Sequence, residues 1–255
     1  MGTHSSFARS VRALRLRRRP GGLFIVPLDH SVTAGPIVHD GDLDRLVSQL
    51  AANGVDAVVL HKGAVRRVNP LRFANLSLIV HLSAGTVRAL DPDARCLVGS
   101  VEEALQLGAD AVSVHVNLGS RAELRQLADL AAVAGECERW GLPLLAMVYP
   151  RGPNIADPAD QELVAHAAAV AADLGADLVK VPQVRDPAKL HDVVRACPIP
   201  LIVAGGPQRS LDELRQSTRD AMRAGVGGAA IGRNVFESAS PGHVARDLAD
   251  LIHGT

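Results

Sequence analysis

The chain has 255 residues, with 27 lysines and arginines balanced by 27 aspartates and glutamates, and is 47% hydrophobic but only 2% aromatic. This length fits two small domains or one large α/β barrel, and so apolar a composition predicts a packed core rather than disorder. A formal net charge of zero argues against a dedicated nucleic-acid-binding protein, which needs a basic surplus to displace counterions.

Two further features of the composition concern location. No apolar run approaches the roughly 20 residues that span a bilayer, so we expect no membrane partner. The three cysteines, Cys96, Cys137 and Cys197, are scattered and lack the spacing of metal ligands. They are typical of reduced residues in a cytoplasmic protein.

Residues 1–20 form a leading segment that is rich in arginine and has no acidic residue. Its arginines are Arg9, Arg12, Arg15, Arg17, Arg18 and Arg19. A transit peptide has this composition, but so does a solvated helix that packs under the first strand of the following domain. We favour the helix, and we assign residues 21–255 to the main domain.

Short apolar runs then alternate with helical patterns along the chain. Eight strands are predicted at residues 23–28, 57–61, 78–82, 111–116, 143–149, 177–181, 200–204 and 228–231. Amphipathic helices are predicted at residues 42–52, 101–107, 120–140, 158–174, 186–196, 210–224 and 241–253. Strands that are apolar throughout and rich in valine and isoleucine are typical of a parallel sheet covered on both faces.

A glycine separates a helix from the next strand at four places, namely Gly54, Gly108, Gly175 and Gly225. Glycine there can adopt the left-handed conformation that ends a helix. Eight strands in about 250 residues, with no linker of biased composition, predict an α/β fold consisting of a single (β/α)8 TIM barrel. The alternative is a doubly wound open sheet. Its three-glycine fingerprint is missing after the first strand, where the residues are Asp-His-Ser.

Polar residues follow directly after the predicted strands, where the active sites of such barrels lie. Lys180 is the clearest candidate, because strand alternation puts Leu178 and Lys180 on one face and Val179 and Val181 on the other. With the branched side chains against the helices, Lys180 points into the barrel mouth. Burial favours a neutral amine, which can attack a carbonyl to form a Schiff base. The alternative role is a structural ion pair with a carboxylate such as Asp29.

Two more side chains at strand ends are candidates for acid–base chemistry. Asp29 could shuttle protons during imine formation, or it could simply hold the ammonium form of Lys180. Tyr149 is the only tyrosine of the chain. Its phenol could exchange a proton with the oxygen at the bond being made or broken, or it could only pack with its hydroxyl satisfied.

The turns after the seventh and eighth strands resemble the usual phosphate site of a barrel. Glycines let backbone N–H groups approach an anion, and Arg233 adds positive potential. Lys62, after the second strand, is expected either to bind substrate or to be merely exposed. The full set of expected binding residues is Gly205, Gly206, Gly232, Arg233, Lys62, His30 and Arg151.

Three histidines suggest an alternative chemistry. His61, His81 and His115 end the second, third and fourth predicted strands, and three imidazoles could hold zinc for a metal-dependent aldolase or hydrolase. No Glu or Cys joins them, and each could instead orient a loop by hydrogen bonding. We therefore expect no metal.

Together, these motifs resemble a known family. The chain is similar to the archaeal-type class I fructose-bisphosphate aldolases and, more closely, to the related 2-amino-3,7-dideoxy-D-threo-hept-6-ulosonate synthases, from Gly22 to His253 in one register. The matching stretches are residues 26–36 (VPLDHSVTAGP), 60–63 (LHKG), 80–83 (VHLS), 147–152 (MVYPRG), 177–181 (DLVKV), 203–207 (VAGGP) and 231–236 (IGRNVF).

The resemblance implies roles for the residues at these positions. The lysine that matches Lys180 forms the Schiff base in this family, and the residues that match Asp29 and Tyr149 act in acid–base chemistry. The positions that match Gly205, Gly206, Gly232 and Arg233 belong to the phosphate site. Members of the family are homo-oligomers that need no metal or other cofactor for the chemical step, and they act on phosphorylated sugars and aldehydes.

The stretches at residues 60–63, 80–85 and 147–152 favour the branch that uses aspartate semialdehyde. This implies that dihydroxyacetone phosphate, or a ketose 1-phosphate, is joined to aspartate semialdehyde. The product would be an amino-heptulosonate-type compound for aromatic biosynthesis of the aminohydroxybenzoate or dehydroquinate type. A fructose-bisphosphate aldolase is the main alternative, followed by a thiolase-like member of the superfamily and a metal-dependent lyase.

Overall fold

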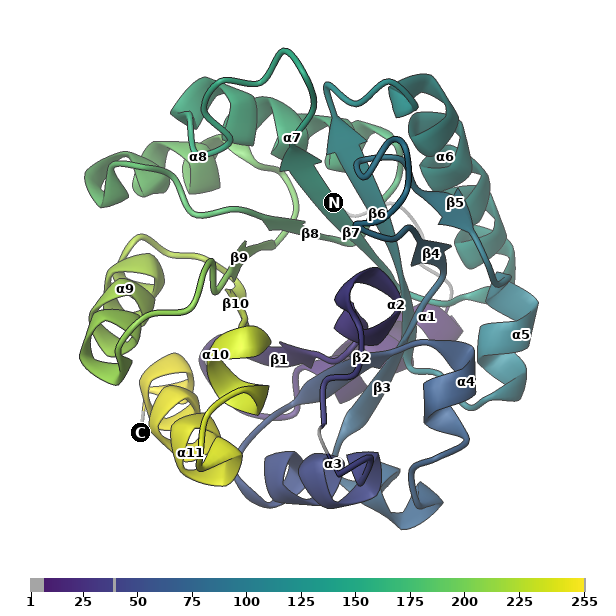
Figure 1. The fold of residues 1–255 in the computed structure, drawn as a ribbon, viewed down its shortest axis with the longest axis vertical. Coiled ribbons are helices and arrows are strands. Elements are labelled where there is room, and N and C mark those ends of the chain that lie inside the picture. The colour runs from purple at the N-terminus through teal and green to yellow at the C-terminus, as the bar shows by residue number, and fades with distance from the viewer. Residues whose placement is uncertain (1–6, 39, 255) are drawn as a thin grey trace.

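The computed structural model describes residues 7–38 and 40–254, so the first six residues of the predicted leading segment lie outside the described residues. The barrel strands are β1 (Leu23–Pro27), β2 (Ala57–Leu60), β3 (Ser77–His81), β6 (Ala111–Leu118), β7 (Leu144–Pro150), β8 (Leu178–Val181), β9 (Leu201–Ala204) and β10 (Gly228–Ala230). They pair in parallel in the order β1-β10-β9-β8-β7-β6-β3-β2, and β1 closes the ring by pairing with both β10 and β2 (Figure 1). The predicted TIM barrel is confirmed, and the open sheet is excluded.

Helices follow most strands and form the outer layer of the barrel. The long ones are α3 (Leu43–Ala52), α5 (Val101–Gln106), α6 (Glu123–Trp140), α7 (Gln161–Asp173), α8 (Leu190–Ala196), α9 (Leu211–Arg223) and α11 (Pro241–His253). All seven were predicted, although the fifth prediction, residues 186–196, divides, because Pro187 begins a separate 3-10 turn, η2 (Pro187–Lys189), capped by Asp186. Within the described residues, no helix combines the length and apolar character needed to cross a bilayer.

The sequence analysis missed the short elements, most of which lie at the carboxyl ends of the strands. They are α2 (His30–Ala34), α4 (Lys62–Val65), the 3-10 turn η1 (Pro70–Ala74), the antiparallel pair β4 (Ser83–Ala84) and β5 (Cys96–Leu97), and α10 (Arg233–Phe236). The helical pieces have five residues or fewer, which is little more than one turn, and the two strands have two residues each, so none of them shows a period of its own.

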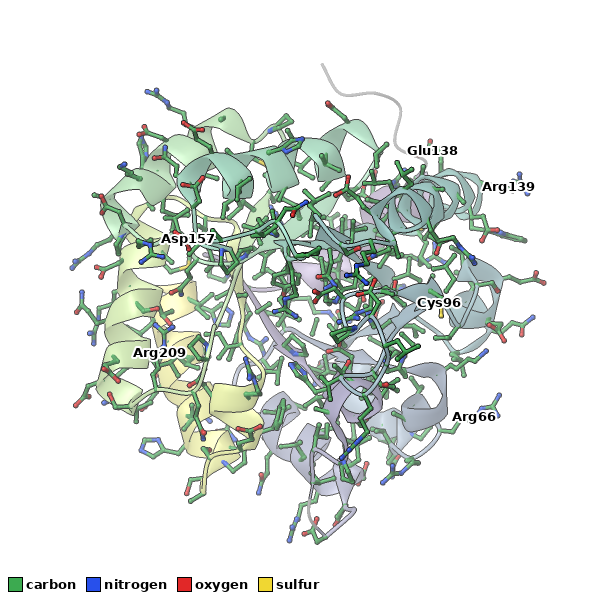
Figure 2. All side chains as sticks on the ribbon, turned by 45° about the horizontal axis from the view of Figure 1, so that its top comes forward. Arg66, Cys96, Glu138, Arg139, Asp157 and Arg209 are labelled. Atoms are coloured by element: carbon green, nitrogen blue, oxygen red, sulfur yellow. The ribbon has the colours of Figure 1, made fainter. Side chains whose placement is uncertain are left out.

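The predicted turn glycines have the expected conformation. Gly54, Gly108, Gly175 and Gly225 have φ angles of 84°, 79°, 91° and 88°. All three cysteines are free thiols. Cys96, which is labelled in Figure 2, is exposed.

Strand alternation divides the apolar residues into two cores. An inner core fills the barrel and includes Ile25, Leu178 and Ile202, whereas Val179 and Val181 belong to the outer core between the strands and the helices. Leu178 and Lys180 therefore share the inward face of β8, as the alternation predicted.

The helix α1 (Phe7–Leu16) closes the amino-terminal end of the barrel and lies behind the strands in Figure 1. Leu16 is 1% exposed and joins the inner core, which confirms the predicted packing of a leading helix under the first strand. Arginines of the leading segment then bind aspartates at this end. The ion pairs are Arg9–Asp177 at 2.7 Å, Arg19–Asp56 at 2.7 Å and Arg15–Asp110 at 3.9 Å.

These three aspartates occupy equivalent places in the fold. Each stands two residues after a turn glycine and directly before the first residue of a barrel strand. Each carboxylate also accepts a backbone N–H from the neighbouring strand, so it satisfies a donor at the strand's start while it binds an arginine. The three bonds are Phe24 N to Asp56 (2.8 Å), Leu78 N to Asp110 (3.0 Å) and Leu144 N to Asp177 (2.7 Å).

Asp56 is the most buried of the three, and we predict that Asp56→Ala destabilises the barrel by about 1–3 kcal/mol. Its carboxylate binds Phe24 N, Arg19 and His253, so removing it leaves buried donors without an acceptor. Urea unfolding measures the change. The control is Asp212→Ala, because that side chain is 92% exposed and its ion pair with Arg215 contributes little. Equal stability of the two variants would contradict the prediction.

Candidate active site

Lys180 and Tyr149 meet inside the mouth of the barrel. They lie on adjacent strands, since β7 and β8 pair with Met147 opposite Lys180. Lys180 is 6% exposed, and its Nζ lies 5.8 Å from the centroid of the Tyr149 ring. Tyr149 is half-buried and packs against the inner core. The amine and the phenol can therefore both reach a ligand held above the inner core.

Asp29 reaches the same mouth from the turn after β1. Its side chain is 15% exposed, with Oδ2 at 3.8 Å from His81 Nε2 and Oδ1 at 3.6 Å from His30 Nδ1. Asp29 Oδ1 and His30 Nδ1 are buried and have no hydrogen-bond partner in the described part of the chain. Buried polar atoms are normally paired, so this pair is a candidate point of contact for a ligand.

The charge on Asp29 follows from its neighbours. Burial by itself raises the pKa of this carboxyl, but His81, His30 and Lys180 together overcome that effect and hold its pKa well below the usual range. Asp29 is therefore a carboxylate at neutral pH and can accept a proton.

The histidines around the mouth are uncharged at neutral pH. Burial lowers the pKa of His30, His61 and His115, and it lowers the pKa of His81 to about 4. His81 Nδ1 lies 2.8 Å from the Ser113 hydroxyl. These rings act as neutral hydrogen-bonding groups rather than as cations.

The three histidines considered as zinc ligands divide between two places. The His61 and His81 rings contact each other at a centroid distance of 5.2 Å. His115 instead lies against the Tyr149 ring at 5.0 Å, and its Nε2 is 2.8 Å from Asn117 Oδ1. Within residues 7–38 and 40–254, no three His, Cys, Asp or Glu side chains converge as metal ligands.

The two glycine turns of the expected phosphate site are joined to each other. Arg233 Nη2 donates to Gly206 O at 3.4 Å, and Asn234 Nδ2 donates to Pro207 O at 3.1 Å. Gly206 has a φ of 73°, and a Cβ there would lie 2.7 Å from Arg209 Nη2. Gly205 comes directly after β9, and Gly232 comes two residues after β10. The strand β9 is next to β8, and β10 is one strand further, so both turns lie on the same side of β8 at the rim.

Lys62 is not brought to Lys180. Its Nζ binds both carboxylate oxygens of Glu103 on α5, at 2.9 and 3.1 Å, and its side chain is 47% exposed. The strand β2 lies four strands from β8 in either direction around the barrel. Two roles were considered for Lys62, substrate binding and simple surface exposure. Its position favours simple surface exposure.

Arg151 does lie beside the reactive pair, and a second arginine accompanies it. The Arg151 guanidinium is 5.9 Å from the Tyr149 ring centroid, and Arg151 Nε is 4.0 Å from Asp93 Oδ1. Arg95 is 7% exposed, and sequence reasoning missed it because it lies in the connection between β4 and β5 rather than at a strand end.

The fold and the site together define a class. A closed parallel barrel that holds a buried lysine, a phenol and an ionised carboxylate at its carboxyl rim has the arrangement of a barrel aldolase. The chain belongs to the DeoC/LacD family of aldolases, whose model matches residues 23–238.

Individual relatives agree with this family. A 2-amino-4,5-dihydroxy-6-oxo-7-(phosphonooxy)heptanoate synthase of Streptomyces griseus is 56% identical over all of this chain and 94% of its own length. A 2-amino-3,7-dideoxy-D-threo-hept-6-ulosonate synthase 1 of Archaeoglobus fulgidus is 42% identical over 92% of this chain and 87% of its own. A solved archaeal fructose-1,6-bisphosphate aldolase, its catalytic lysine covalently bound to a carbinolamine intermediate, is 29% identical, with a TM-score of 0.88 over 96% of this chain and 100% of its own. The resemblance seen in the sequence is confirmed.

The low pKa of His81 predicts a pH dependence of stability. The unfolded chain protonates this histidine below about pH 6.5, whereas the fold resists protonation until about pH 4. The stability that depends on neutral His81 is therefore fully present above pH 6.5. As the pH falls from 6.5 to 4, the free energy of unfolding decreases by roughly 3 kcal/mol in total.

We expect His81→Gln to reduce the slope of unfolding free energy against pH by about one proton over this window. Urea unfolding at pH 7, 6, 5 and 4.5 measures the slope. His243→Gln is the control, because that side chain is 67% exposed on α11. The prediction is wrong if His81→Gln keeps the wild-type slope.

Proposed function

We propose that this aldolase forms a Schiff base between Lys180 and dihydroxyacetone phosphate, and joins this donor to aspartate semialdehyde. The observation that carries the proposal is the buried Lys180 amine, which shares the barrel mouth with Tyr149 and Asp29. The heptanoate synthase name of the relative that is 56% identical supports the choice of substrates.

The first half of the reaction makes the iminium. The neutral Lys180 amine attacks the C2 carbonyl of dihydroxyacetone phosphate, whose phosphate is held by the turns at Gly205 and Gly232. Asp29 takes a proton from the nitrogen of the new C–N bond and passes it to the alkoxide, which gives the neutral carbinolamine. Asp29 then relays a second proton, taken from solvent, to the carbinolamine hydroxyl, which leaves as water and gives the iminium. An ionised Asp29 whose Oδ1 has no hydrogen-bond partner among the described residues suits this relay.

The second half forms the carbon–carbon bond. Loss of a proton from C3 turns the iminium into an enamine, and C3 then attacks the aldehyde carbon of the acceptor. The aldehyde oxygen gains a proton as it becomes a hydroxyl, and Tyr149 relays this proton. Water hydrolyses the iminium to release the product and the free amine. Holding donor and acceptor together removes much of the entropic cost of this step.

A fructose-bisphosphate aldolase is the second candidate, because the barrel also matches the archaeal enzyme of that name. The two functions share the donor and differ in the acceptor. Product formation with aspartate semialdehyde, compared with glyceraldehyde 3-phosphate, decides between them. The homo-oligomer, the cytoplasmic location and the boundary after residue 20 stay predictions.

Trapping tests the Schiff base directly. We expect dihydroxyacetone phosphate and borohydride to add one reduced adduct to the protein, which peptide mapping locates at Lys180. Lys180→Met removes the amine but keeps most of the stem, so it should abolish both the adduct and turnover. Lys189→Met, at an exposed lysine in η2, is the matched control and should trap normally. Substantial turnover by Lys180→Met would disprove the mechanism.

Removing only the phenol oxygen separates the two halves of the reaction. We expect Tyr149→Phe to retain the adduct at Lys180 but to lower kcat for aldol formation about 10²–10⁴-fold, because the ring remains and the proton relay is lost. Trapping and steady-state rates on the same preparation measure both effects. A kcat within threefold of wild type would exclude Tyr149 from proton transfer.

A further inference from the structure

We propose that Arg95 and Arg151 form a subsite for the carboxylate of the aldehyde acceptor. This inference rests on the proposed function and adds what recognises its second substrate. Arg151 follows β7, and Arg95 stands in the connection after β3, whereas the phosphate turns follow β9 and β10. Since β8 lies between β7 and β9, the two anion sites lie on opposite sides of Lys180.

Arg95 is a buried cation that, within the described part of the chain, hydrogen-bonds to backbone oxygens and to no carboxylate. It is 7% exposed, and its Nη1 donates to the backbone oxygens of Pro92 and Ala94, each at 2.7 Å. Among residues 7–38 and 40–254, no carboxylate lies within ion-pair distance of its guanidinium. Burying a charge costs folding free energy unless the charge is paired. A buried guanidinium that has no carboxylate at ion-pair distance is therefore suited to bind an anionic ligand.

The connection that carries Arg95 is fixed in place. Two buried amides, Asn117 on β6 and Gln126 on α6, donate to the backbone oxygen of Asp93 at 2.8 and 3.3 Å. Arg95 also packs on Gly85, where a Cβ would lie 2.7 Å from Arg95 Nη1 and 2.4 Å from Ala94 O. The guanidinium is therefore preorganised, which lowers the entropic cost of binding.

This fixed connection also reaches the catalytic mouth. Val87 N donates to Thr33 O of α2, the helix that begins beside Asp29. Burial, and next the positive charge of Arg95, lower the pKa of His115, whose ring contacts Tyr149 at 5.0 Å. The Arg151 guanidinium lies over the Tyr149 ring as well, 5.9 Å from its centroid. Both guanidinium groups thus border the place where the acceptor aldehyde meets Tyr149.

The chemistry of the cluster favours a carboxylate over a phosphate. Two guanidinium groups offer the planar donors that fit a carboxylate. Asp93 Oδ1, 4.0 Å from Arg151 Nε, adds a negative charge that disfavours a phosphate dianion and can accept from an ammonium group. An acceptor with an amino-acid end, such as aspartate semialdehyde, carries both complementary charges.

The test compares acceptors at saturating dihydroxyacetone phosphate. L-Aspartate semialdehyde, uncharged butanal and glyceraldehyde 3-phosphate are assayed with wild type, Arg95→Met and Arg151→Met. We expect each substitution to lower the ratio of kcat/KM for aspartate semialdehyde to that for butanal by about tenfold or more, mainly through KM, because a charged hydrogen bond to the acceptor is lost. Arg95→Lys, which keeps the charge, should recover part of this ratio.

Arg88→Met is the matched control, since Arg88 is an exposed arginine of the same connection and should leave the ratio unchanged. Borohydride trapping at Lys180 verifies that each variant folds. If Arg95→Met does not trap, the result with Arg151→Met, at an exposed residue, decides the test. An unchanged ratio in a variant that traps overturns the subsite, as does a loss confined to glyceraldehyde 3-phosphate. Failure of the proposed function is distinct: wild type would then give no adduct or no product with aspartate semialdehyde.

Discussion

The parallel pairing of β1 with β2 on one side and with β10 on the other closes the sheet, and the closed sheet determines where each reactive side chain lies. Parallel strands bring all their carboxyl ends to one rim. Alternation then sends every second side chain into an interior that Ile25, Leu178 and Ile202 help to fill. Lys180, two residues beyond Leu178 on the same face, lies at the top of this packed interior. The barrel therefore positions the amine through the geometry of the strand itself.

The two ends of the barrel differ in how their buried polar groups are satisfied. At the amino end, the chain supplies its own partners, as where Asp56 accepts from Phe24 N and binds Arg19 and His253. At the carboxyl end, Asp29 Oδ1 has no partner in the described residues, and Arg95 finds only backbone carbonyls there. Leaving such groups unpaired costs stability. Because these unpaired polar groups gather at the carboxyl rim, this rim is suited to bind a polar ligand.

The sequence predicted those features that depend on local periodicity. Alternation along the chain predicts the eight strands and the inward direction of Lys180, and glycine's conformational freedom predicts the left-handed turns. Neither depends on a contact with a distant residue. Partners far apart in the chain could not be predicted in this way. Glu103, which binds Lys62, is 41 residues away, and the position of Arg95 depends on Asn117 holding the backbone of Asp93. One-turn helices such as α2 and two-residue strands such as β4 are likewise set by tertiary contacts rather than by a period of their own.

In the proposed function, donor chemistry and acceptor choice therefore rest on different parts of the chain. Lys180 belongs to a barrel strand, and the two turns proposed to hold the phosphate follow two other barrel strands, so moving any of them disturbs the closed sheet. The connection that carries Arg95 instead leaves the barrel between β3 and β6, and it is held mainly by hydrogen bonds to its backbone. A loop of this kind can change its side chains without altering strand register. Under this proposal, the same Schiff-base machinery can serve different acceptors, because the groups proposed to recognise the acceptor are not the groups that hold the lysine.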